Sequence, residues 1–93
     1  MSEKIKNVRM TIHGRVQGVG FRYSTLEKAR EHHIKGYVKN QYDGAVFIEA
    51  EGEETDVDHF IQWCHQGPRM ARVSHVNQSP GTVQHHTSFS IKH

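Results

Sequence analysis

The stretch GRVQGVGFR, residues 14–22, joins two segments that differ in hydrophobic periodicity. Before it, residues 5–13 alternate between apolar and polar side chains, as in a half-buried strand. The apolar side chains of that strand are Val8, Met10 and Ile12. After it, residues 22–33 place Leu26 and Ala29 at helical spacing among charged residues. The stretch therefore predicts a strand, a glycine-rich turn and an amphipathic helix.

The rest of the chain extends this pattern. Asp43-Gly44 is a dipeptide of tight hairpin turns, Thr55 is expected to cap a second helix, and Gly67-Pro68 is expected to end it. The other expected elements are strands at residues 37–40, 45–50 and 71–76, a polar loop at residues 77–85 and a closing extended segment at residues 88–92. The order β-α-β-β-α-β predicts an α+β, ferredoxin-like (split β-α-β) sandwich, with two helices on one face of a four-stranded, mainly antiparallel sheet.

Length and charge narrow the function classes. The 93 residues predict one domain, residues 1–93, and a formal charge of +2 without a Lys/Arg block argues against nucleic-acid binding. No apolar run approaches the roughly 18 residues of a membrane span. The single cysteine, Cys64, excludes an internal disulfide and fits a reducing compartment. We therefore expect a cytoplasmic protein that binds neither nucleic acid nor membrane.

The glycine-rich turn is a candidate anion site. A strand ending near His13 and a helix starting near Arg22 would place residues 14–21 against the helix N-terminus. Unpaired backbone N–H groups and the positive end of the helix dipole favour an anion there. Glycines let the backbone curl into a concave nest of N–H donors, and Arg22 adds a charged, forked donor. The turn therefore predicts a site for a tetrahedral oxyanion.

Other motifs and roles fit these residues less well or stay open. The dinucleotide pattern G-x-G-x-x-G fails because Gly18 and Gly20 are followed by Tyr23, and the Gly-Lys-Ser/Thr of a phosphate-binding Walker loop is absent. Taken alone, the glycines would also suit a plain strand-to-helix turn. Arg15 is either a substrate ligand or a solvated charge, and Asn40 alone would suit a turn.

The histidines and the cysteine predict neither a metal site nor a thiol nucleophile. The pairs His32-His33 and His85-His86 are adjacent, so their side chains point apart, and no H-x-x-x-H or C-x-x-C spacing occurs. Cys64 completes the apolar stripe of the second helix, so we expect it in the core.

GRVQGVGFR resembles the signature loop of the acylphosphatases. The segments GYVKNQYDGAVFIEAEG, FIQWCHQGPRMARVSHV and FSI resemble the same family, so the match runs from about His13 to Ile91. The resemblance implies hydrolysis of the carboxyl–phosphate bond of acyl phosphates to a carboxylate and inorganic phosphate, without a metal, another cofactor or a covalent phosphoenzyme. It implies a small-molecule acyl phosphate as the partner, and we expect a monomer.

The resemblance also implies roles for individual residues. Arg22 would grip the phosphate and Asn40 would orient the attacking water, while backbone amides of the loop would cradle the phosphate oxygens. The expected substrate-binding residues are Arg15, Val16, Gln17, Gly18, Val19, Gly20, Phe21 and Arg22.

Two other functions stay open. One is a phosphate-ligand binding or regulatory module that kept the cradle without turnover. The other is a detached domain of larger maturation proteins that handle carbamoyl phosphate. The chain also has His32 and His33 where the family usually has leucine and glycine. Glycine would end the first helix in the left-handed conformation at little cost, so we expect His33 to fray the helix end or to lower stability rather than to reduce activity.

Overall fold

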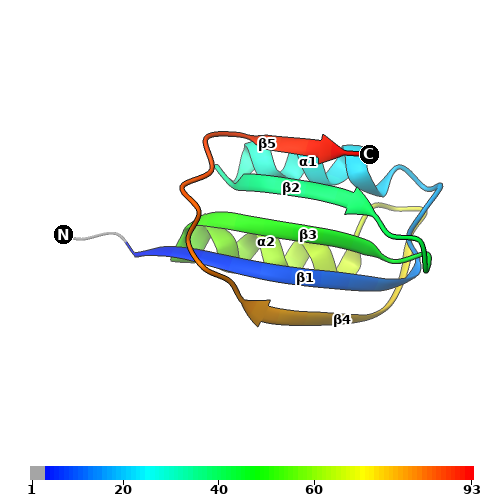
Figure 1. Ribbon diagram of the computed structural model, residues 1–93. Helices are drawn as coiled ribbons and strands as arrows, with labels where there is room; N and C mark the ends of the chain where they lie inside the picture. The colour runs from blue at the N-terminus through cyan, green and yellow to red at the C-terminus, as the bar shows by residue number, and fades with distance from the viewer. Residues whose placement is uncertain (1–3) are drawn as a thin grey trace.

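The structure, a computed structural model, describes residues 4–93 as one sheet covered by two helices (Figure 1). In chain order the elements are β1 (Ile5–Arg15), α1 (Phe21–Glu31), β2 (Lys35–Asn40), β3 (Val46–Glu53), α2 (Glu54–Gln66), β4 (Arg72–Pro80) and β5 (Phe89–Lys92). The strands lie in the order β4-β1-β3-β2-β5, and every pair is antiparallel except β2 and β5. Both helices lie on the same face. The ferredoxin-like α+β prediction is confirmed, and β5 adds a fifth strand to the four expected.

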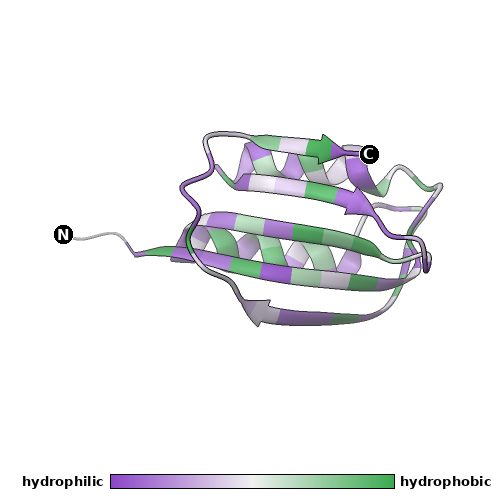
Figure 2. Cartoon of the chain, viewed as in Figure 1, coloured by the Kyte–Doolittle hydropathy of each residue, from purple (hydrophilic) through white to green (hydrophobic). Residues whose placement is uncertain are grey.

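The core lies between the sheet and the helices. Val8, Met10 and Ile12 of β1 are buried, as their alternation predicts, and the hydropathy colouring of Figure 2 shows this alternation along the strands. Cys64 is also buried in this core, as its place in the apolar stripe predicts. The other buried side chains of α2 are Val57, Phe60 and Ile61.

Helix α1 ends in a Schellman motif centred on His33. The helix stops at Glu31, two residues before the end expected from the sequence. The N–H of Ile34 donates to the carbonyl of Ala29 at 2.7 Å, and the N–H of His33 donates to the carbonyl of Arg30 at 3.4 Å. His33 has φ 59°, in the left-handed region that this motif normally fills with glycine. The conformation that the family comparison implied for His33 is therefore present.

Replacing His33 with glycine is expected to stabilise the protein. A left-handed conformation costs an L-residue with a Cβ atom about 1 kcal/mol, and His33 is exposed, so few contacts would be lost. We expect His33→Gly to raise Tm by about 4–8 °C, measured by thermal unfolding. His32→Gly is the matched control, because His32 has φ −99° and gains nothing from glycine. An equal gain in both variants would contradict the explanation.

Helix α2 starts earlier than predicted. Its N-cap is Glu53 and not Thr55, and no side chain caps it. The N–H of Glu54 instead donates to the backbone carbonyl of Lys4 at 2.9 Å. A capping partner so distant in the chain leaves no local signal, which explains the error. The predicted end is confirmed, since Gly67 follows the helix with φ 71°.

Strand β4 is longer than predicted. It continues through Pro80 and includes the first part of the expected polar loop at residues 77–85. The strand lies at an edge of the sheet and its side chains are mostly exposed, so its sequence lacks the alternation of a half-buried strand. Pairing with β1, and not hydrophobic pattern, holds it in place.

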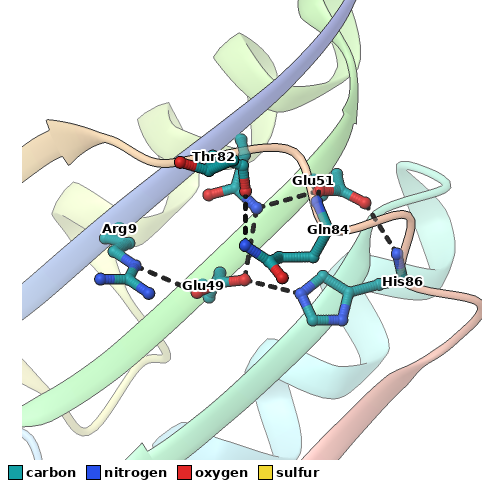
Figure 3. A network of polar contacts seen from close by, with 7 residues as sticks. Arg9, Glu49, Glu51, Thr82, Gln84 and His86 are labelled. Atoms are coloured by element: carbon teal, nitrogen blue, oxygen red, sulfur yellow. Dashed lines mark hydrogen bonds and ion pairs between the residues drawn. The ribbon is translucent and has the colours of Figure 1, made fainter.

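Residues 81–88, called the strap below, connect β4 to β5 across the face of the sheet without helices (Figure 1). Glu49 and Glu51 of β3 point to this face and are 2% and 3% exposed. Glu51 accepts hydrogen bonds from the backbone N–H groups of Gln84 and His86 at 2.7 and 2.8 Å (Figure 3). Glu49 bonds the ring of His86 at 2.6 Å and Arg9 at 3.1 Å. Two buried carboxyl groups therefore hold the strap on the sheet.

Strap attachment is expected to weaken in acid. Burial alone would raise the pKa of Glu49 and Glu51. Hydrogen bonds outweigh this effect and lower the pKa of both groups below 4.5. The donors are His86, Asn7 and Arg9 for Glu49, and Asn7 with the backbone of Gln84 and His86 for Glu51. A carboxyl group whose pKa is lowered by folding stabilises the fold above its unfolded pKa. That contribution is lost as the pH falls from about 4.5 through the lower folded pKa.

Urea unfolding between pH 7 and pH 3 measures this effect. We expect the urea concentration at the unfolding midpoint of the wild type to decrease as the pH is lowered below about 4.5. In Glu51→Gln this decrease should be less steep, because the variant takes up one proton fewer on unfolding. Glu27→Gln, at an exposed position of α1, is the control and should keep the wild-type slope. A wild-type slope in Glu51→Gln would show that this carboxyl does not couple protonation to stability.

Candidate active site

The loop between β1 and α1 is anchored at both ends and exposed between them. The side chains of Val16 and Phe21 are 1% and 2% exposed and belong to the core. Between them Gly18 and Gly20 are exposed and have φ values of 75° and 76°, which L-residues with a Cβ rarely adopt. Buried anchors therefore fix the ends of a backbone curve whose middle faces solvent. Val16 and Phe21 can offer a ligand only their backbone groups.

The N-terminus of α1 has free donor capacity. Gly20 is its N-cap, no side chain caps the helix, and its first turn contains no acidic residue. Among the residues that the structure describes, the backbone N–H groups of residues 17–23 have no backbone acceptor. These donors and the helix dipole give this end of the molecule a positive potential. The arrangement suits a bound anion.

Arg22 lies in the first turn of α1 with its side chain partly exposed. Its guanidinium Nη1 is 3.4 Å from Nδ1 of His93. His93 follows β5, which runs parallel to β2, so both strands end at the same end of the sheet. Figure 1 shows the β1–α1 loop, the β2–β3 turn and the end of β5 gathered there.

Asn40 is the last residue of β2 and is exposed beside this loop. It lines a pocket of about 660 Å³ together with Gln17 of the loop. The other lining residues are Lys39, Gln41, Tyr42 and His93, and none of the described residues that line the pocket is acidic. Because His93 also contacts Arg22, the pocket adjoins the arginine. Arg22, Asn40 and the loop thus meet at one end of the sheet.

The predicted hairpin turn holds Asn40 in place. The N–H of Gln41 donates to the carbonyl of Ala45 at 2.8 Å, and Gly44, with φ 94°, donates back to the carbonyl of Gln41 at 3.2 Å. Asp43 accepts a bond from the N–H of Ala45 at 3.0 Å. The turn expected from Asp43-Gly44 is confirmed, and it closes immediately after Asn40.

Other candidate residues lie elsewhere. Arg15 is exposed at the end of β1, opposite Arg72 of β4, and does not line the pocket. Cys64 is fully buried, and burial raises the pKa of its thiol well above the usual range, so it is no nucleophile. Among residues 4–93, no group of three or more His, Cys, Asp or Glu side chains is placed to hold a metal ion.

Sequence reasoning missed two features of the site. It assigned Gln17 only a backbone role, whereas its side chain donates to the carbonyls of Gln41 and Ala45 at 2.7 and 2.9 Å. It gave His93 no role, because a contact 71 residues from Arg22 depends on the β2–β5 pairing. The long polar side chain of Gln17 within the glycine-rich loop was the one local signal available.

Comparison with known proteins identifies the family of the chain. The profile of the acylphosphatase family matches residues 8–91, which include the loop, Arg22 and Asn40. The chain belongs to the acylphosphatase family. An acylphosphatase of Mannheimia succiniciproducens is 44% identical over 86 residues, covering 91% of this chain and 96% of that protein. An acylphosphatase of Acaryochloris marina is 43% identical over 91 residues, covering 98% of each.

Solved structures agree with the family assignment. The crystal structure of acylphosphatase from Bacillus subtilis superposes with a TM-score of 0.91 at 34% identity, covering 97% of this chain and 100% of that one. Full-length HypF, in a phosphate- and nucleotide-bound form, matches all of this chain with only 12% of its own length, at a TM-score of 0.89 and 28% identity. Acylphosphatase relatives at these identities identify the chain as an acylphosphatase hydrolase. Within residues 4–93, neither helix is long and apolar enough to cross a membrane.

Proposed function

We propose that the chain hydrolyses the carboxyl–phosphate bond of acyl phosphates by direct attack of water on a phosphate held by Arg22 and the loop amides, with Asn40 orienting the water. The observation that supports this most is the uncapped N-terminus of α1, which carries Arg22 in its first turn next to the pocket that Asn40 lines. The reaction needs a cation and N–H donors to hold the phosphate, and a neutral amide to orient the water. Arg22, the loop backbone and Asn40 supply these groups.

Each group has a distinct task. Arg22 offers two parallel N–H donors to phosphate oxygens and a charge that cannot be titrated away. The backbone N–H groups of the loop, from Val16 to Phe21, complete the cradle. Asn40 accepts a hydrogen bond from water through its carbonyl and donates through its amide, which fixes the direction of approach. We propose that Arg15, which lies outside the pocket at the end of β1, acts on the substrate only through its positive charge.

The reaction needs no general base. The water oxygen forms a bond to phosphorus, the bond from phosphorus to the acyl oxygen breaks, and the carboxylate leaves with the electron pair. A phosphate oxygen of the substrate takes the water's proton. Because a carboxylate is a good leaving group, positioning and electrostatic stabilisation supply the rate enhancement. We also propose that the protein acts as a cytoplasmic monomer without cofactor. The free thiol of Cys64 fits the cytoplasmic location.

Phosphate release from benzoyl phosphate in the presence of EDTA tests the proposal. We expect steady release from the wild type, and none from phenyl phosphate, whose phenoxide is a poorer leaving group. No release from folded wild-type protein would overturn the proposal and favour the binding module. Loss of activity in EDTA, restored by a divalent cation, would overturn the metal-independent mechanism.

A further inference from the structure

We propose that Gln17 is a positioning residue that sets the distance between the phosphate cradle and Asn40. This inference rests on the proposed function. Both side-chain N–H groups of Gln17 have acceptors on the β2–β3 turn, the carbonyl of Gln41 at 2.7 Å and that of Ala45 at 2.9 Å. Gln41 directly follows Asn40. The glutamine therefore ties the loop to the segment that carries the water-orienting amide.

The turn that Gln17 contacts is closed by its own hydrogen bonds. Each of the two carbonyls also accepts a bond from within the turn, Ala45 from Gln41 at 2.8 Å and Gln41 from Gly44 at 3.2 Å. The hairpin thus keeps its shape without Gln17, and the glutamine adds only the connection to the loop. Gln17 is not needed to close the turn, and its bonds join the phosphate-binding loop to the segment that carries Asn40. We therefore expect it to set the relative position of these two parts of the site.

The phosphate cradle has its own supports. Val16 and Phe21 are buried in the core, and Arg22 is fixed by α1, so the cradle does not depend on Gln17 for its shape. Loss of the Gln17 amide should consequently leave phosphate affinity nearly unchanged. It should lower turnover, because a displacement of about 1 Å between reacting groups costs about a hundredfold in rate. This separation of binding from turnover marks a positioning role.

The test combines Gln17→Met, which keeps length and removes both donors, with Asn40→Ala. We expect Gln17→Met to lower kcat for benzoyl phosphate by about ten- to a hundredfold, with KM and competitive inhibition by inorganic phosphate within about threefold of the wild type. In the Asn40→Ala background the same change should cost less than about threefold, because the amide that Gln17 positions is gone. Gln78→Met, at an exposed position of β4, is the matched control.

Each outcome decides the inference. Additive losses in the two backgrounds, or a raised KM with unchanged kcat, would overturn it. If Gln17→Met does not fold, Gln17→Ala takes its place in the same cycle. An inactive wild type overturns the proposed function and this inference with it, whereas an active wild type whose kcat survives the change at Gln17 overturns this inference alone.

Discussion

Replacement of Asn40 with alanine is expected to lower kcat for benzoyl phosphate by about a hundredfold or more while leaving phosphate binding almost intact. Asn40 lines the pocket next to the loop but belongs to β2, so its loss removes no part of the phosphate cradle. The water would still enter the pocket but would no longer be held in line with the bond that breaks. Steady-state kinetics with inorganic phosphate as a competitive inhibitor measure both quantities.

Two comparisons make the Asn40 result interpretable. Asn77→Ala removes an exposed asparagine of β4 and should keep wild-type kcat. Far-ultraviolet circular dichroism and Tm should match the wild type, because Asn40 is itself exposed. An Asn40→Ala protein with normal kcat, or one that loses phosphate binding and turnover to the same degree, would refute the role of water orientation.

Replacement of Arg22 with alanine is expected to damage binding and turnover together, lowering kcat/KM by about a thousandfold or more. The guanidinium is the permanent charge at the N-terminus of α1, and the loop amides alone cannot neutralise a phosphate dianion. Phosphate inhibition should weaken in parallel. Arg22→Lys keeps the charge without the planar fork, so we expect it to recover part of the binding and little of the turnover.

Arg30→Ala is the control for Arg22. Arg30 is exposed on the same helix and lies near its C-terminal end, away from the loop. It removes one positive charge from the protein, as Arg22→Ala does, and should leave kcat/KM within about twofold. Equal losses in both variants would mean that net charge, and not the local contact of Arg22, governs activity.

The sequence predicts the phosphate-binding loop and the turn after Asn40 better than it predicts the Gln17 contacts that join them. Glycine spacing, the change of period at Arg22 and the Asp43-Gly44 turn are local signals, and each of them located its element. The left-handed conformation at His33 was likewise predictable, because one residue type is strongly preferred there.

The features that the sequence did not predict depend on contacts between distant segments. Lys4 caps α2 with a backbone carbonyl, a group that every residue carries. Glu49 and Glu51 are of a residue type that is usually exposed, and the strap buries them. Gln17 bonds two carbonyls of the turn, so no side-chain identity on the partner marks the pair. Contacts to backbone atoms leave no pattern in a single sequence.

The path of the strap makes the addition of β5 to the sheet costly in conformational entropy. Strands β4 and β5 follow each other in the chain but lie at opposite edges of the described sheet, so residues 81–88 must cross β1, β3 and β2 between them. The chain loses the freedom of that crossing before β5 gains its contacts with β2. We therefore expect the strap and β5 to open together as one unit when the protein unfolds locally. Because His93 follows β5 and contacts Arg22, such a partial opening would reach the phosphate cradle without disturbing the helix that carries it.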